Sequence, residues 1–553
     1  MSFNFPILIF IFIQTQTAMR QFKLSRFLKK ITNQLNWSFV TILLSFSLTS
    51  ACYSHPEGHS RTGVNISLLS SFKIGGFDTG AAEIVAYDPK TQQAFVTNSE
   101  KNAVDIISIS EPSKPSLINS IDLTPFGNPT SVAVKNNLVA VALSSDNKQD
   151  NGTLAVFDTK GMLLNSFKTG PLPDMVTFTP NGRYILIANE GEPNDEYTID
   201  PEGSISILKL TANIKKLDQS SMKTADFKNF NQKKLAPSVR VFGKNASPAQ
   251  DFEPEYITVS SNSKTAWVSL QENNALAVVS INEAKITKVI GLGFKSFENT
   301  KNGLDASDKD GEVLMRRWPV LGIYQPDSIA SYKVKGKTYI VTANEGDARD
   351  YQGFSEQVRV ANAQLDSSLT KQYPELTKPN NLGRLKITKV NGDTDNNGKL
   401  NELYTFGARS FSIWDASTGQ QVYDSGSQLG DIIAKRYPRL FNKGDTRSDD
   451  KGVEPEALTL GEINHQTYAF IGLERSSGIV AYNISNPNDV YFSDYFTNIS
   501  PALADDDPMQ GDIAPEGLAF INAKDSPINK AILLAANEVS GTLSIYLIEE
   551  RQH

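Results

Sequence analysis

The sequence predicts an all-β fold, a seven-bladed β-propeller closed by an N-terminal strand, with its long loops on one face. A turn followed by a strand of alternating apolar and polar residues recurs seven times along the 553 residues, opening at Ala81, Asn128, Leu172, Glu253, Gln325, Glu454 and Ala514. Second and third strands follow each opening, and helical periodicity is scarce. Radially repeated four-stranded sheets are the β architecture that such a repeat describes.

The closing strand is predicted from a gap in the last copy. That copy lacks a fourth strand, because the sequence ends with SIYLIEERQH. Residues 65–75 (NISLLSSFKIG) precede the first copy, alternate suitably and would pair beside residues 541–547. We therefore assign residues 64–550 to the propeller. Two packed sandwiches are the alternative, although they leave the recurrence of one turn and strand pair in register unexplained.

Residues 1–52 have the order of an export signal. Basic residues after Met19 precede an apolar stretch at 37–48, and small residues then lead to Cys52. This stretch is shorter than the roughly 18 residues that a membrane-spanning helix needs. The segment LTSAC resembles a bacterial lipobox, so we expect lipidation of Cys52 and attachment to a membrane of the bacterial cell envelope. Ordinary cleavage before Cys52 is the alternative, and residues 53–63 are expected to form a polar linker.

Composition restricts the chemistry. The net charge is -7, and the sequence after the N-terminal signal has no Lys/Arg-rich run that could bind a nucleic-acid backbone. Nucleic acid is therefore not expected as a partner. The single Cys excludes a disulfide framework and a multi-thiolate zinc site. Two of the four His lie in the linker, one ends the sequence, and His465 lies in a short connection. A Ser-His-Asp triad or a His-rich zinc site is therefore not expected.

Long insertions are expected at one end of the strands, at about 204–252, 291–325 and 346–408. They precede the first strand of a copy or follow its second strand, whereas connections between first and second strands are short. Antiparallel pairing brings these two positions to the same end of a sheet. Binding and catalytic residues usually lie on such a loop-rich face. The alternative is that these insertions have no function and are merely tolerated at the surface.

Acidic residues recur at two positions of the repeat on that same face. Six copies carry an acid directly before the first strand, with Thr130 in the remaining copy: Glu83, Asp174, Glu255, Asp327, Glu456 and Glu516. A second acidic position follows the second strand: Glu100, Glu190, Glu272, Glu345, Glu474 and Glu538. Converging carboxylates need compensation by backbone amides, arginines or cations. Their hard oxygens suit Ca²⁺, with Mg²⁺ or Mn²⁺ as alternatives, and capping of turns by each acid is the non-metal explanation.

Two insertions add acid clusters that are further metal candidates. The first contains Asp305, Asp308 and Asp310. The second contains Asp393, Asp395 and Asn397 at alternate positions before Gly398, which imitates an EF-hand loop without its flanking helices or bidentate Glu. We expect a non-helical Ca²⁺ loop there, with an Asx-rich turn as the alternative.

Three arginines near these acids are candidate contacts for a ligand or a phosphate group: Arg316, Arg349 and Arg409. A guanidinium group suits phosphate oxygens bidentately. Charge compensation of the neighbouring acids is the alternative.

The segments RRWPVLGIYQPDSIASY, TANEGDARDYQGFSEQVRV and FGARSFSIWD closely resemble the choice-of-anchor I family, and the resemblance runs from about residue 66 to residue 547. It implies exported, surface-attached propellers whose means of attachment varies. Relatives include mesenchyme-specific cell-surface glycoproteins linked to biomineralisation, and some carry an alkaline phosphatase label. The resemblance assigns no catalytic residue.

The leading hypothesis is an exported, lipid-anchored cell-envelope propeller that binds a divalent cation and presents its loop-rich face to an unidentified ligand or envelope protein. A metal-dependent phosphoester hydrolase, in which Arg316 or Arg349 orients phosphate, is the alternative. A purely structural interaction platform without an ion is the third hypothesis.

Overall fold

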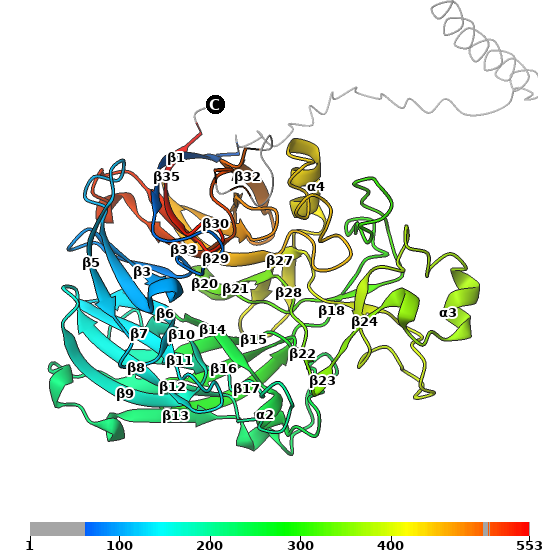
Figure 1. Cartoon of the computed structure of the whole chain (residues 1–553), viewed down its shortest axis with the longest axis horizontal. Coiled ribbons are helices and arrows are strands. Elements are labelled where there is room, and N and C mark those ends of the chain that lie inside the picture. The colour runs from blue at the N-terminus through cyan, green and yellow to red at the C-terminus, as the bar shows by residue number, and fades with distance from the viewer. Residues whose placement is uncertain (1–60, 501–506, 508, 552–553) are drawn as a thin grey trace, which may run out of the picture. The chain divides into compact units, whose positions relative to one another are not determined.

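A computed structural model describes residues 61–500, 507 and 509–551 (Figure 1). The predicted signal peptide, Cys52, His55, His59 and His553 lie outside the described residues. In the described part of the chain, no helix combines the length and the apolar character that crossing a bilayer demands.

The described residues form seven four-stranded antiparallel sheets, so the predicted all-β fold is confirmed. The first sheet contains β2 (Val85–Asp88), β3 (Gln93–Asn98), β4 (Ala103–Ser108) and β5 (Ser116–Asp122). The second contains β6 (Asn128–Lys135), β7 (Leu138–Ser144), β8 (Asn151–Asp158) and β9 (Leu163–Pro171). The third contains β10 (Pro173–Phe178), β11 (Tyr184–Asn189), β12 (Ser204–Lys209) and β13 (Met222–Asp226). The fourth contains β14 (Pro254–Val259), β15 (Thr265–Leu270), β16 (Ala275–Ser280) and β17 (Lys285–Gly291).

The last three sheets follow the same plan. The fifth contains β20 (Ile329–Val334), β21 (Lys337–Asn344), β27 (Ser410–Asp415) and β28 (Gln421–Asp424). The sixth contains β29 (Pro455–Ile463), β30 (Gln466–Leu473), β31 (Ile479–Asn483) and β32 (Tyr491–Phe496). The seventh contains β33 (Pro515–Ile521), β34 (Ile532–Asn537), β35 (Thr542–Glu550) and β1 (Val64–Lys73).

The N-terminal strand completes the seventh sheet. β1 pairs antiparallel with β35 from Val64 opposite Glu550 to Lys73 opposite Thr542, with one bulge between Leu68 and Ser70. The predicted pairing of the first and last strands of the body is therefore confirmed.

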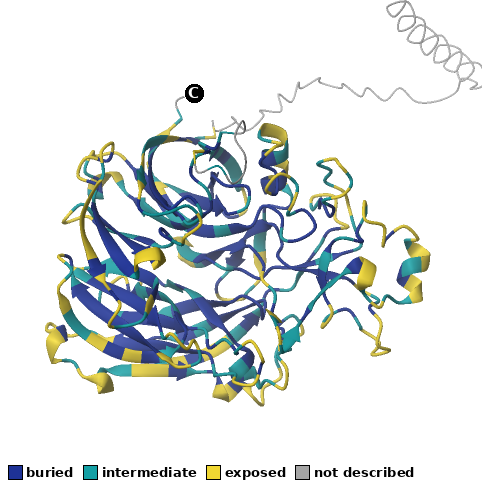
Figure 2. Cartoon of the chain, viewed as in Figure 1, coloured by how far each residue is buried: buried dark blue, intermediate teal, exposed yellow. Residues whose placement is uncertain are grey.

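Hydrophobic clusters join each sheet to the next. For example, Phe95 and Val104 of the first sheet pack with Val139 of the second. The seventh sheet also packs on the first, where Leu534 shares a cluster with Val96. The first strands of the sheets contact one another in the circuit β2, β6, β10, β14, β20, β29, β33 and back to β2. Figure 2 shows buried residues concentrated in the second and third strands of the sheets, and exposed residues mainly in the connections and the outer strands.

The insertions form a sheet of their own, which no pattern in the sequence predicted. It contains β18 (Phe294–Ser296), β19 (Leu321–Ile323), β26 (Tyr404–Thr405), β25 (Lys386–Thr388) and β24 (Gln357–Arg359), beside a hairpin of β22 (Asp350–Tyr351) and β23 (Phe354–Ser355). Its core is a separate cluster that includes Phe297, Leu382 and Ile387. The predicted boundary of the first insertion at 204 is wrong, because β12 and β13 are regular third and fourth strands of their sheet.

Helices are few and short in the described residues. The α-helices are α2 (Pro248–Asp251), α3 (Ser367–Gln372) and α4 (Gln428–Arg436). The 3-10 helices are η1 (Ser99–Lys101), η2 (Ile214–Lys216), η3 (Gln219–Ser221), η4 (Lys228–Phe230), η5 (Val360–Asn362) and η6 (Ala523–Asp525). Of the three α-helices, α4 packs Leu429 and Ile433 into the cluster between the fifth and sixth sheets.

Candidate metal centre

The acids predicted before the first strands converge. A single cavity of ≈ 390 Å³ is lined by all six of them, together with Glu190, Glu345 and Thr130. The predicted convergence on one opening is therefore what the structure shows. We call this group of eight acids the carboxylate ring: Glu83, Asp174, Glu190, Glu255, Asp327, Glu345, Glu456 and Glu516.

A repeated local structure directs these side chains inward. In most copies the acid follows a proline at the start of the first strand, as in Pro173–Asp174 and Pro455–Glu456. Proline is tolerated at the first residue of a strand, because its missing N–H is not needed there. The strand register shifts directly after both prolines. Such bulges reorient a side chain, and here they place the acid beside the cavity.

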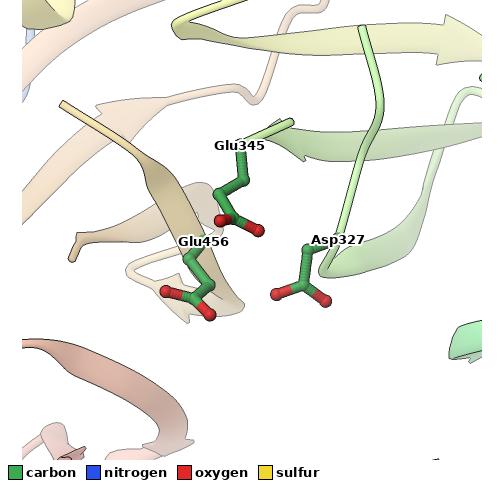
Figure 3. A group of neighbouring side chains, drawn as sticks. All are labelled: Asp327, Glu345 and Glu456. Carbon is green, nitrogen blue, oxygen red and sulfur yellow. The ribbon is translucent and has the colours of Figure 1, made fainter. Parts of the chain in front are cut away.

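Three members of the ring lie close enough to share one ion. Oxygen atoms of Asp327, Glu345 and Glu456 all lie within 4.8 Å of one another. The three side chains point toward one another in Figure 3. Asp327 and Glu345 flank the inner strands of the fifth sheet, whereas Glu456 belongs to β29 of the sixth sheet. This triad therefore links two neighbouring sheets.

One basic group and one amide contact the triad. Lys451 Nζ lies 2.6 Å from Glu345 Oε1. Gln271 Nε2 donates to the other oxygen of Glu345 at 3.0 Å. By contrast, Glu456 Oε2 is buried and has no hydrogen-bond partner among the described residues. Three carboxylates and one ammonium group would leave a formal charge of about -2 if all were ionised.

Burial and mutual repulsion raise the pKa values of the ring. Burial, followed by repulsion from Glu474 and Glu345, raises the pKa of Glu456 well above its usual value. Burial, followed by repulsion from Glu345, raises the pKa of Asp327 well above its usual value. Burial raises the pKa of Glu83 to about 7, against the lowering effect of a hydrogen bond from Ser99.

Other ring members carry unsatisfied oxygen atoms. Glu255 is 8% exposed, and its Oε2 has no hydrogen-bond partner among the described residues. Oε2 of Glu516 also has no hydrogen-bond partner among the described residues. A buried carboxylate oxygen without a donor is costly, so these oxygens need a proton, a cation or an ordered water molecule. The alternative in which each acid merely caps a turn does not describe these residues.

Basic side chains pair with two acids of a neighbouring cluster, although burial and repulsion from Glu454 still raise the pKa of Glu474 to about 8. Oxygens of Glu345, Glu454 and Glu474 also lie within 4.8 Å of one another. However, Arg447 Nη2 lies 2.9 Å from Glu454, and Arg475 Nη1 lies 2.7 Å from Glu474. Compensation by basic side chains therefore occurs beside the ring. Glu454, in the segment KGVEPE, was missed because only the acid after the proline was assigned a role.

The acids of the first insertion bind protein groups instead of converging. Asp305 is buried and accepts a hydrogen bond from the Leu314 N–H at 2.7 Å. Arg384 Nε lies 2.8 Å from Asp308. Burial opposes ionisation of Asp308, but hydrogen bonds from Arg384 and Lys309 lower its pKa to about 2. Asp310 accepts from a backbone N–H two residues later. Among the described residues, these acids belong to no group of three with oxygens close enough for one ion.

The second insertion has the hydrogen bonds of an Asx-rich turn. Asp393 accepts from the backbone N–H groups of Asn397 and Gly398, both at 2.9 Å. The Asn397 side chain donates to Asp395 at 2.9 Å. These bonds occupy oxygens that a cation would need, so the geometry matches the alternative to the predicted Ca²⁺ loop.

Two of the three arginines predicted to contact an anion are buried and bind groups of the protein itself. Arg349 is 2% exposed, pairs with Asp251 and lies 3.0 Å from Glu253. Arg409 is buried and donates from Nη1 to the Asp305 carbonyl oxygen at 2.7 Å. Both placements match charge compensation and packing, and neither residue lines the ring cavity. Arg316 is exposed and lines a different cavity, which shares no lining residue with the ring cavity.

Comparison with known proteins gives a family. A family model described as "Choice-of-anchor I domain" matches residues 83–487. Gigasin-3a from Magallana gigas is 26% identical over 193 residues, covering 32% of this chain and 68% of that protein. A mesenchyme-specific cell surface glycoprotein from Strongylocentrotus purpuratus is 28% identical over 290 residues, covering 44% of this chain and 37% of the relative.

Solved structures are also similar. A streptogramin B lyase has a TM-score of 0.44 and 11% identity, covering 88% of this chain and 98% of its own. The WD40 domain of Toxoplasma gondii coronin has a TM-score of 0.45 and 6% identity, and the match covers 89% of this chain and 87% of the coronin chain.

Proposed function

The chain belongs to the choice-of-anchor I family, and on that premise we propose that it is an exported cell-surface β-propeller whose carboxylate ring binds a divalent cation, with Ca²⁺ as the first candidate. The contact circuit of the seven first strands supports a closed ring of seven blades. Family membership supports a position at the cell surface, where lipidation of Cys52 is the proposed attachment. The loop-rich face around the cavity is the proposed surface for a ligand or an envelope protein.

The observation that best supports a cation site is the triad of Asp327, Glu345 and Glu456. Its oxygens lie within 4.8 Å of one another, yet Lys451 is the basic group that contacts it directly. A divalent cation would match the remaining charge and remove the repulsion that raises the pKa values. It would also bind the fifth and sixth sheets to each other.

The cavity favours Ca²⁺ over Mg²⁺. Ca²⁺ takes about 6 to 8 oxygen ligands in flexible geometry, whereas Mg²⁺ demands a near-ideal octahedron. Carboxylates on separate strands provide irregularly placed oxygens, and a cavity of ≈ 390 Å³ leaves room for water molecules that complete the shell. Mn²⁺ is the remaining alternative.

Calorimetry on chelator-treated protein tests the proposal. We expect Ca²⁺ to bind and to raise the melting temperature of the wild type. Asp327→Asn should weaken binding by at least about tenfold, because it removes one charged ligand. Glu283→Gln is the matched control, since Glu283 is exposed and does not line the cavity. The absence of heat and of stabilisation with Ca²⁺, Mg²⁺ and Mn²⁺ would remove the cation and leave the interaction platform.

The hydrolase hypothesis has less geometric support. It needs an arginine beside the carboxylates, but Arg349 is buried in ion pairs and Arg316 lines another cavity. Phosphate release from a panel of phosphoesters in the presence of each of the three cations tests this hypothesis directly.

A further inference from the structure

An open groove of ≈ 820 Å³ lies between the insertions and α4, away from the carboxylate ring. Its lining includes Arg316, Arg317 and Trp318, with Tyr373 and Glu298 on the insertion side and Asp431 of α4. We propose that this groove binds an anionic saccharide, a sugar ring that carries a carboxylate or a sulfate group. This site is independent of the cation proposed for the ring.

The two adjacent arginines carry the anionic part of the argument. Both are exposed, and neither guanidinium makes an ion pair or a hydrogen bond to the residues that the structure describes. The buried arginines Arg349 and Arg409 differ, because carboxylates accept from Arg349 and backbone carbonyl groups accept from both terminal nitrogens of Arg409. Arg316 and Arg317 therefore keep two planar donor groups that suit a carboxylate or a sulfate.

The backbone and the neighbouring indole hold this pair in place. Arg316 exchanges backbone hydrogen bonds with Leu304 in both directions, at 2.8 and 3.1 Å. The Trp318 Nε1–H also donates to the Leu304 carbonyl oxygen at 3.1 Å. Trp318 also packs in part against the hydrophobic core of the insertions, and the part of its side chain that stays exposed lines the groove. An aromatic surface beside a few polar groups is typical of small-molecule sites.

The acidic residues of the groove identify the rest of the ligand. Glu298 accepts from the Tyr373 hydroxyl at 3.1 Å, and Asp431 accepts from the Ser427 hydroxyl at 2.7 Å. Carboxylate oxygens have further acceptor capacity, so they suit ligand hydroxyl groups. A simple anion would gain nothing from these acids, whereas a neutral sugar would leave both arginines unused. A sugar acid or sulfated sugar satisfies both kinds of group.

Titration calorimetry with defined tetrasaccharides tests the proposal. The probes are tetragalacturonate, a sulfated tetrasaccharide and neutral maltotetraose, and EDTA keeps the carboxylate ring free of cations. We expect at least one anionic tetrasaccharide to bind with a stoichiometry of about one, at least about tenfold more tightly than maltotetraose. Arg316→Gln and Arg317→Gln should each weaken this binding by about tenfold.

Arg183→Gln is the matched control, because Arg183 is exposed on the connection between β10 and β11 and should leave binding unchanged. Trp318→Ala should weaken binding further, and Trp318→Phe should retain part of it if the first variant fails to fold.

Several results would overturn the proposal. They are equal binding by Arg316→Gln, Arg317→Gln and Arg183→Gln, equal affinity for the neutral tetrasaccharide, or no binding of either anionic tetrasaccharide by the wild type. Inorganic sulfate binding as tightly as the tetrasaccharides would indicate a simple anion site and remove the saccharide.

Discussion

Replacing Glu83 with Gln is expected to remove one step from the pH dependence of stability in the absence of cations. Burial raises the pKa of Glu83 from 4.5 to about 7. The folded state therefore holds this proton more tightly than the unfolded state. The stabilisation is fully present below the unfolded pKa and is lost as the pH rises through about 7. Glutamine cannot ionise, but its amide oxygen can still accept the hydrogen bond from Ser99.

The size of the effect follows from the pKa shift and the length of the folded unit. One pKa unit corresponds to about 1.4 kcal/mol, so the full shift of Glu83 is worth at most about 3 kcal/mol. The unit Thr62–His553 has roughly 490 residues, which gives an unfolding entropy of about 1 kcal/mol per kelvin. The melting temperature of the wild type should therefore fall by about 3 °C more than that of Glu83→Gln between about pH 5 and pH 8.

Differential scanning calorimetry in EDTA measures this difference, and Glu283→Gln controls for the loss of an exposed charge. Equal pH slopes for the wild type and Glu83→Gln would refute the argument that burial in the ring raises this pKa. Because protons and Ca²⁺ compete for the same oxygens, added Ca²⁺ should stabilise the wild type more at about pH 8 than at about pH 5.

Three further variants test other parts of the structure. Lys451→Met should lower the melting temperature in EDTA but increase the gain on adding Ca²⁺, since the triad loses its ammonium partner; an unchanged gain would separate Lys451 from the ion site. Arg349→Met leaves Asp251 and Glu253 buried without their partner, which should cost about 3 to 5 kcal/mol and lower the melting temperature by about as many degrees; a fall no larger than that of Arg183→Met would contradict the buried pairing. Deleting residues 62–73 leaves the edge of β35 unpaired, so size-exclusion chromatography should show association or aggregation; a stable monomer would contradict a stabilising role for β1.

The repeat made much of the ring predictable. An acid in the same place of each copy must occupy the same end of each sheet, so convergence follows once the strands are in register. The partners of these acids could not be predicted in this way. Lys451 and Arg475 lie outside the recurring acid positions, and Glu454 precedes the proline. Which acids are neutralised therefore became clear only from the folded positions of these side chains.

The insertions show a second limit of sequence patterns. β18 and β19 have three residues each, too few for an alternation signal, and one partner of β19 is β26, about 80 residues later. Arg349 lies close in sequence to the recurring acid Glu345 and was therefore predicted as a candidate contact for a ligand or a phosphate group. Its carboxylate partners at 251 and 253 lie about 100 residues earlier, and a pairing over that separation leaves no local pattern.

The contrast between the two acid clusters bears on how the ring functions. Arginines supplied by loops form ion pairs with Glu454 and Glu474, so the fold can provide counter-charges where loops reach. The inner acids, including Asp327 and Glu456, start strands that crowd around the cavity, and protons or ions from solvent remain as their counter-charges. A cation at a concentration one hundred times its dissociation constant stabilises the folded state by about 2.7 kcal/mol. This is close to the ionisation cost of one ring carboxylate, about 3 kcal/mol. Occupancy of the ring by Ca²⁺ should therefore offset about one such cost at neutral pH, while linking the fifth and sixth sheets through Asp327 and Glu456.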